Sequence, residues 1–117
     1  MKIKFISPEM EEFVCKYIDS FLHWDLLIFF HHNQGTIDTI EQIAMRLGRR
    51  VEDVEKALGD LVERKILNKK REGNSFLFYY SPEKNVKKQI EEFDSSVESR
   101  AFRLEVLSLI LEKELHY

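Results

Sequence analysis

The chain of 117 residues is long enough for one domain, or for one small domain with an additional arm, and it can bury a core without disulfides or metals. Hydrophobic residues make up 44% of it and charged residues 33%, proportions that exclude a disordered protein. The formal net charge of −3 gives no overall attraction for a polyanion, so nucleic-acid binding would require a local excess of basic groups.

Cysteine content and hydropathy favour a cytoplasmic protein. Cys15 is the single cysteine and has no internal disulfide partner, which is typical of a reducing compartment. The N-terminus lacks the charged, apolar and small-residue order of a signal peptide. The most apolar run, residues 21–30, is about half as long as a membrane span and contains His23 and Asp25. We therefore expect a cytoplasmic location and no contact with a membrane.

Two helices are predicted before residue 35. The sequence Ser-Pro-Glu at residues 7–9 is a typical helix start, because serine caps free amides, proline fits the first turn and an acid suits the helix dipole. An apolar stripe over residues 13–18 follows. Asp19 and Ser20 then indicate the cap of a second helix, whose apolar positions lie within residues 24–30.

Two further helices are predicted in the segment up to Lys65. Thr39 and Gln42 match a capping box, in which each side chain bonds the backbone amide of the other, and Gly48 ends the short helix that they open. A longer helix follows and ends near Lys65. Its inward positions are Val54, Ala57, Leu58, Leu61 and Val62, and its outward positions are Glu52, Lys56, Gly59 and Glu63.

The next segment has the pattern of a β-hairpin. Two β-type runs, residues 66–71 and 75–80, are joined by a turn at residues 72–74 that contains glycine. Alternation along the second run predicts three inward aromatic side chains, Phe76, Phe78 and Tyr80. A second Ser-Pro-Glu at residues 81–83 predicts another helix start, and the pattern beyond it is helical.

The element order (helix, extended link, short helix, tight turn, helix, hairpin) and the apolar positions carry a resemblance. These positions are Ile43-Ala44, Leu47-Gly48, Val54, Leu58, Leu61-Val62 and Ile66-Leu67, with Phe78 and Tyr80-Ser81-Pro82 at the end of the hairpin. In this pattern residues 20–82 resemble winged helix-turn-helix regulators. The resemblance implies a mainly α fold, with a winged helix-turn-helix domain (three-helix core plus β-hairpin wing) in residues 1–82 that includes the N-terminal helix. One departure is Lys65, where many members of that family have glycine.

Charge distribution and the resemblance together indicate a DNA-binding face. Residues 46–71 carry nine basic and five acidic groups, a local charge of +4 between acidic flanks. In the family the third helix enters the major groove and the wing lies along the backbone or minor groove. Lys56 is the basic group on the outward face of that helix. The expected phosphate contacts are Arg46, Arg49 and Arg50 at the turn, and Lys69, Lys70, Arg71 and Asn74 on the wing.

Three other functions compete with DNA binding. A winged helix used as a protein-docking module, with merely solvated basic groups, is the main alternative. Cys15, Asp19 and His23 share a helical spacing that suits metal ligands, but the helix break expected at Asp19 and Ser20 would separate them, so no metal or other cofactor is predicted. No nucleophile motif, phosphate loop or catalytic carboxylate pair is recognisable, so no enzyme is predicted.

Residues 83–117 form a predicted C-terminal helical arm. Apolar residues from Val86 to Leu111 follow alternating steps of four and three, interrupted at Arg100, which allows one long helix across residues 94–96 or two shorter ones. Apolar side chains surround the segment between residues 104 and 111, so it requires cover on more than one side. A second copy of the chain supplies that cover, through the predicted interface residues Leu104, Leu107, Ile110 and Leu111. The alternative is that the arm folds back on Phe13, Tyr17 and Trp24.

The sequence thus predicts a homodimeric transcriptional regulator that binds double-stranded DNA. Protein symmetry is mirrored in the half-sites of such regulators, so a site with two-fold symmetry is expected. The alternative remains a protein-interaction module within a larger assembly, with a protein partner in place of DNA.

Overall fold

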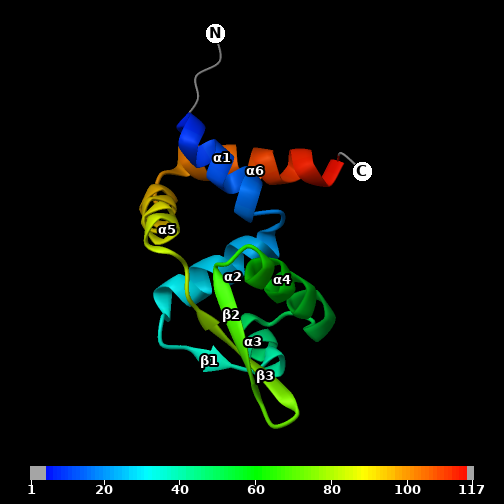
Figure 1. Ribbon diagram of the computed structural model, residues 1–117. Coiled ribbons are helices and arrows are strands. Elements are labelled where there is room, and N and C mark those ends of the chain that lie inside the picture. The colour runs from blue at the N-terminus through cyan, green and yellow to red at the C-terminus, as the bar shows by residue number, and fades with distance from the viewer. Residues whose placement is uncertain (1–4, 116–117) are drawn as a thin grey trace.

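The computed structural model describes residues 5–115, which form an elongated, mainly helical body of about 57 × 32 × 22 Å with a small antiparallel sheet. Figure 1 shows the helices α1 and α6 at one end and the hairpin at the other. Within the described residues no helix is both long and apolar enough to cross a membrane. The elements are α1 (Pro8–Tyr17), α2 (Phe21–His32), β1 (Ile37–Asp38), α3 (Ile40–Leu47), α4 (Val51–Glu63), β2 (Leu67–Glu72), β3 (Ser75–Tyr80), α5 (Lys84–Ser96) and α6 (Arg100–Leu115).

The first two helices are separated where the sequence predicts a break. Ser7 caps α1 by accepting a hydrogen bond from the Met10 amide, and Ser20 caps α2 by accepting one from the His23 amide. The break at residues 18–20 turns the chain, so that α1 packs against α5 and α6 while α2 crosses the middle of the molecule toward α4 (Figure 1).

The C-terminal segment is two helices, the second of the two alternatives that the sequence left open. α5 ends at Ser96 and α6 begins at Arg100. The turn is stabilised locally, since the Ser99 hydroxyl accepts from the Phe102 amide and Arg103 donates to the carbonyl oxygens of Val97 and Glu98. Serine and aspartate compete with the helix for backbone hydrogen bonds, which favours a break there.

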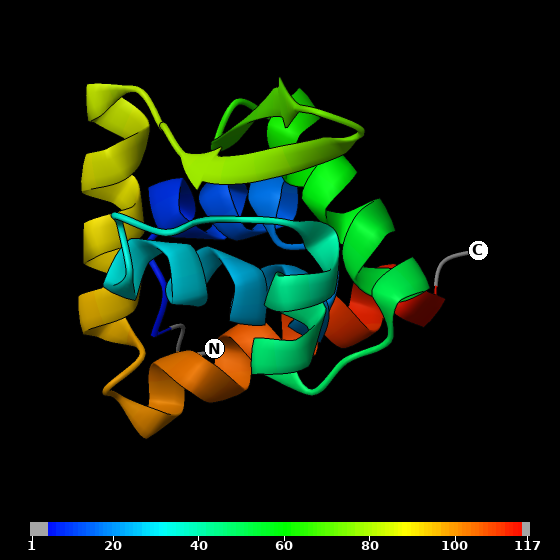
Figure 2. The same ribbon diagram turned by 90° about the horizontal axis from the view of Figure 1, so that it is seen from below.

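Both C-terminal helices fold back on their own chain, as the alternative interpretation of the arm expected. Phe93 of α5 is fully buried and its ring lies 5.8 Å from that of Phe13, 5.6 Å from that of Trp24 and 5.8 Å from that of Phe102. α5 also begins later than predicted, because Pro82 precedes it and Glu83 is its N-cap, without a side-chain hydrogen bond. Figure 2 shows α5 standing along one side of the molecule, with α6 turning away beneath it.

The middle of the chain agrees closely with its sequence pattern. The reciprocal capping box of Thr39 and Gln42 begins α3, and Gly48 ends it at a φ of 64°, in the left-handed region that glycine adopts without strain. On α4 the four predicted inward positions from Val54 to Leu61 are buried and Val62 is half-buried, whereas the predicted outward positions are exposed.

Lys65, at the position where many winged helix-turn-helix regulators have glycine, has a backbone conformation that favours glycine. It is the one described residue other than glycine with a positive φ, at 65°, and it links α4 to β2. The Lys65 and Ile66 amides donate to the Val62 and Leu61 carbonyls. The helix therefore ends in the conformation that favours glycine, and the lysine adopts it at a cost of about 1–2 kcal/mol.

The sheet has the order β1-β3-β2, and both pairs are antiparallel. β1 forms from the predicted extended link, with Ile37 opposite Tyr79, and holds the start of α3 beside the hairpin. β2 and β3 pair from Leu67 opposite Tyr80 to Glu72 opposite Ser75, and Gly73 at a φ of 62° permits the tight turn. The hairpin extends beyond the helices, as Figure 1 shows, so that its tip lies away from the core.

Candidate nucleic-acid interface

The hairpin divides its three basic side chains, all predicted to contact phosphates, between two faces. Residues opposite each other in an antiparallel pair point to the same side, and alternate residues point to opposite sides. Arg71 pairs with Phe76 and Lys69 with Phe78, so these four share one face, whereas Lys70 pairs with Leu77 on the other. The basic groups of the hairpin thus lie on both of its faces and do not form one patch.

Phe76 lies on the basic face and is more exposed than the sequence predicts. It shares the face of Phe78, as the strand alternation predicts. It is nevertheless 44% exposed, whereas Phe78, two residues closer to the core, is 5% exposed, so Phe76 lies beyond the core that it was expected to face. The Lys69 ammonium lies 4.7 Å from the centroid of the Phe76 ring, within cation–π distance. Arg71 donates through Nε to the Gly73 carbonyl at 3.1 Å, which fixes its stem against the turn.

Within residues 5–115, the basic side chains of the hairpin have no acidic neighbour close enough for an ion pair. Lys69, Lys70 and Arg71 are all exposed, and no ion pair of the described chain includes any of them. Asn74 is also exposed, in the turn that follows Gly73. The charge of this hairpin is therefore available to an anionic partner.

The three predicted turn arginines differ, because each lies next to a carboxylate of its own chain. Their side chains are 41% to 78% exposed. Surface pairs of this kind contribute only about 0–1 kcal/mol, so a phosphate can replace the carboxylate at small cost. The pairs are Arg46–Asp38 at 3.3 Å, Arg49–Asp25 at 2.6 Å and Arg50–Glu52 at 3.7 Å.

The outward face of α4 is predominantly acidic. Lys56 is exposed on it between Glu52 and Glu63, and no ion pair joins Lys56 to another residue in the described part of the chain. A phosphate would be repelled by the acids of this face, whereas the cytosine amino group can donate to a carboxylate. If the helix meets DNA, it therefore suits base contacts better than backbone contacts.

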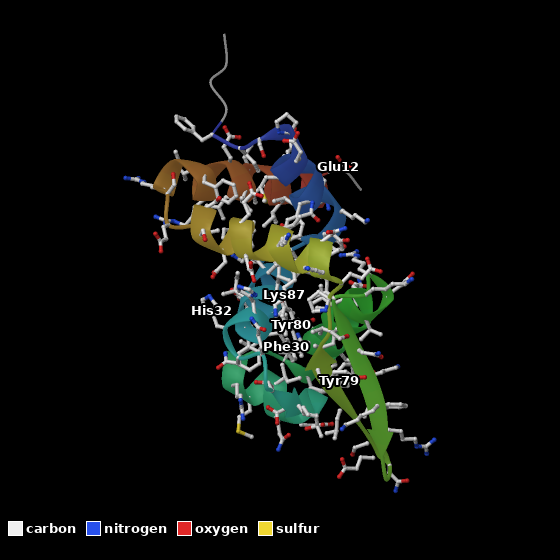
Figure 3. All side chains as sticks on the ribbon, turned by 60° about the vertical axis from the view of Figure 1, so that its left-hand side comes forward. Glu12, Phe30, His32, Tyr79, Tyr80 and Lys87 are labelled. Atoms are coloured by element: carbon white, nitrogen blue, oxygen red, sulfur yellow. The ribbon has the colours of Figure 1, made fainter. Side chains whose placement is uncertain are left out.

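Histidines join α2 to its neighbours at both of its ends. His23 Nε2 lies 2.8 Å from Asp60 Oδ2 of α4, in the first turn of α2. In the last turn, His31 Nδ1 lies 3.0 Å from the Tyr80 hydroxyl of β3. Burial, with Glu91 and Asp94 nearby, raises the pKa of the Tyr80 hydroxyl well above its ordinary value. Figure 3 shows Tyr80 near Phe30 below α5, with Tyr79 nearer the hairpin tip.

The helix break expected from the sequence separates Cys15 from the other two candidate ligands, but Asp19 and His23 stay close together, in contrast to the expectation that all three would be separated. Cys15 is exposed on α1, and the helix break removes it from Asp19 and His23. Within the described residues, one ligand atom from each of Asp19, His23 and Asp60 lies within 4.8 Å of the others. Asp60 comes from a different helix, so no sequence spacing could have indicated its place beside His23.

α6 presents an apolar row to solvent on the side opposite its buried residues. Leu104 is 54% and Leu111 49% exposed, and Leu107 is half-buried beside them. Ile110 is fully buried in the core of its own chain and is not available at the surface, in contrast to its predicted place in a dimer interface. Phe5 adds a further exposed ring, which with Ala101, Leu104, Glu105 and Ser108 lines a small cavity of about 280 Å³.

Comparisons with protein-family models, with curated proteins and with solved structures find no match for this chain. A function is therefore inferred from the elements, charges and surfaces described above. Two of these surfaces have no cover within the described residues: the basic hairpin at one end and the apolar row of α6 at the other.

Proposed function

We propose that residues 20–82 form a winged helix-turn-helix domain that binds double-stranded DNA, and that the protein is a homodimeric transcriptional regulator in the cytoplasm. The order α2, α3, α4 and hairpin supports this proposal, with α4 as the recognition helix and the β2–β3 hairpin as the wing. The observation that carries it is the wing, whose exposed Lys69, Lys70 and Arg71 have no acidic partner in the described chain.

The wing would supply most of the affinity in this proposal. Lys70 on one face and Lys69 with Arg71 on the other would contact phosphates on both sides of the hairpin as it lies along the backbone. Phe76 would pack against sugars between the cations of its face. Such contacts set the position of the protein on DNA and carry little sequence information.

The recognition helix would supply sequence preference. Lys56 would donate to a base or a nearby phosphate, and Glu52 would accept from a cytosine amino group. Arg50 lies 3.7 Å from Glu52, so it could turn to a phosphate once that carboxylate engages a base. The contribution of the turn arginines would thus depend on exchanging a carboxylate of the chain for a phosphate of the DNA.

A second copy of the chain would cover the apolar row of α6. Leu104 and Leu111 are a heptad apart and lie opposite the buried face of the helix, with Leu107 at their margin. Leu104 and Leu111 each expose about half of their surface. Burial of this apolar surface between two chains favours association through the hydrophobic effect. The dimer would then present two wings to a site with two-fold symmetry.

The test of DNA binding is a titration of labelled genomic duplex fragments at several salt concentrations. The variant Lys69→Ala/Lys70→Ala/Arg71→Ala should bind much more weakly at moderate salt, and the salt slope should fall by roughly 1 for each phosphate that is no longer neutralised. Lys84→Ala/Lys88→Ala, at exposed positions of α5, is the control for removal of positive charge and should bind like the wild type. Equal binding by the wing variant, or no duplex binding by the wild type at low salt, contradicts the proposal.

The test of the dimer is the mass in solution by light scattering. We expect a wild-type dimer at micromolar concentration and a folded monomer for Leu104→Glu/Leu111→Glu. Met45→Glu, at a methionine of α3 that is 79% exposed, adds a charge elsewhere and should leave the dimer intact. A monomeric wild type would remove the dimer from the proposal without affecting the DNA titration.

A protein-docking module is the second candidate, and the surface of the helix-turn-helix segment favours it. The outward face of α4 is acidic, Met45 of α3 is 79% exposed, and Val51 at the start of α4 is 39% exposed. An acidic surface with apolar side chains suits a basic, amphipathic protein segment better than it suits phosphates. If the wild type fails to bind duplex at low salt, this candidate replaces DNA binding.

A further inference from the structure

Three polar side chains from different parts of the chain converge beside the N-terminus of α2. Asp19 lies in the link before α2, His23 in the first turn of α2 and Asp60 on α4. One ligand atom from each lies within 4.8 Å of the other two. An imidazole and two carboxylates form a set of donors that suits divalent ions of the first transition row.

The imidazole of His23 is held in a fixed orientation. Its Nδ1 lies 2.7 Å from the Ser20 hydroxyl, which also accepts from the His23 amide at 3.2 Å. Its Nε2 consequently faces Asp60, at 2.8 Å from Oδ2, and the residue is only 7% exposed. Histidines that bind metals usually have the second ring nitrogen held in this way, because the orientation of the ligand is then set before the ion arrives.

The carboxylate of Asp19 is held charged and in place. Burial disfavours its charged form, but hydrogen bonds from Arg64 and Lys113 outweigh burial and keep the pKa of this carboxyl below its ordinary value. Lys113 Nζ lies 2.9 Å from Oδ1, and Arg64 pairs with Oδ2. These cations hold the carboxylate in place beside His23 and Asp60 and balance part of the negative charge there.

A cavity adjoins the cluster and leaves room for further ligands. Its volume is about 550 Å³, and Asp19, His23 and Asp60 are among its lining residues. Asp53 and Glu114 line it as well, so carboxylates lie on more than one wall. Water molecules or one of these acids could complete the coordination of an ion that has three protein ligands.

We propose that Asp19, His23 and Asp60 bind one divalent transition-metal ion, such as Zn²⁺ or Mn²⁺, between the link that precedes α2 and the helix α4. The ion takes the position between His23 Nε2 and the two carboxylates, and His23 keeps a proton on Nδ1 that it donates to Ser20. This site differs from the sequence-based expectation, because it excludes Cys15 and includes Asp60. It does not depend on the proposed DNA binding.

Binding of the ion at this site would stabilise the position of α4. Ligands from the link and from α4 are joined by the metal, so its binding stabilises the contact of the proposed recognition helix with the helical end of the molecule. Ligand binding to the folded state alone raises stability by RT ln(1 + [L]/Kd), about 2.7 kcal/mol at a hundredfold excess over Kd. Wild-type protein should therefore melt at a higher temperature in the presence of the ion.

The experiment is isothermal titration of the full chain with Zn²⁺ and, separately, Mn²⁺, with thermal denaturation in parallel. Wild type should bind one ion per chain, and Asp60→Asn, which keeps an acceptor for His23, should weaken binding roughly tenfold or more. His23→Gln should do the same. His32→Gln removes an exposed imidazole that pairs with Asp94, and Cys15→Ser removes the exposed thiol. Both controls should bind like the wild type.

Two results would overturn the proposal. One is a wild type that binds neither ion at millimolar concentration. The other is a loss of binding in His32→Gln or Cys15→Ser as large as that in Asp60→Asn, because the ion would then sit on exposed side chains. Circular dichroism checks that the variants fold, and if His23→Gln unfolds, Asp60→Asn alone decides between the outcomes.

Discussion

The β2–β3 hairpin, the proposed wing, and the junction of α1, α2 and α6 both carry basic side chains, but these side chains have different surroundings. At the junction, Arg64 and Lys113 are largely covered and converge on Asp19, and Lys113 also donates to the Cys15 carbonyl. On the wing, Lys69 and Lys70 are exposed and have no carboxylate beside them in the described chain. The position of acids relative to bases, and not the number of bases, separates cations that hold the fold from cations available to a partner.

The aromatic side chains of the two regions also differ, since they are buried at the helical end and exposed at the hairpin tip. Phe93 is fully buried among three other rings at the helical end, whereas Phe76 on the wing is 44% exposed and lies beside the Lys69 ammonium. The helical end therefore depends on packing, and the hairpin tip contributes little to stability. Substitutions that act on one region and not the other test this difference.

The largest effect on stability is expected for Phe93→Ala. Removal of a fully buried phenylalanine leaves a cavity and should lower the free energy of unfolding by about 3–5 kcal/mol. Phe76→Ala removes the same side chain from an exposed position and should change stability by less than about 0.5 kcal/mol. Urea unfolding followed by circular dichroism measures both. Similar losses in the two variants would mean that the wing is part of the core.

A smaller effect is expected for Asp19→Asn, which leaves Arg64 and Lys113 without a charged partner. Because the pair is only partly buried, the loss should be about 1–2 kcal/mol at neutral pH. The pKa of Asp19 is lowered in the folded state, so its contribution is present above the ordinary pKa of 3.8 and is lost as the pH falls through the folded value. Wild type and variant should therefore begin to converge in stability as the pH falls below about 4, and should become equal only below the lowered pKa of Asp19. A difference that persists in acid would point to shape, not charge.

Local signals in the sequence predicted the middle of the chain well. The capping box of Thr39 and Gln42, Gly48 and the apolar spacing of α4 each act within a few residues, so their pattern determines the helix that they specify. The sequence-based prediction of hairpin strands was correct to within one residue at each end. Local chemistry specifies such elements without information about tertiary contacts.

Non-local arrangements were less predictable, for identifiable reasons. The spacing of apolar residues in the C-terminal arm is the same whether a second chain or the protein's own α1 covers them, so it could not show that Ile110 is internal. Strand alternation does not reveal where a hairpin leaves the core, and hence Phe76 was expected inside. Asp60 is far in sequence from Asp19 and His23, and only the packing of α4 on α2 brings it to them.

The smallest effect is expected at Lys65, where the chain passes from α4 to the wing. Its φ of 65° is strained for lysine, and glycine would relieve about 1–2 kcal/mol while losing part of this through the greater freedom of the unfolded chain. Lys65→Gly should thus raise the free energy of unfolding by about 0.5–1 kcal/mol. Lys65→Ala is the matched control, because it removes the same charge but keeps the Cβ, and it should give no such gain. If alanine stabilises as much as glycine, charge and not backbone strain is the cause. Neither variant should alter binding through the wing, since the lysine side chain lies before β2 and outside the paired positions that carry Lys69 and Arg71.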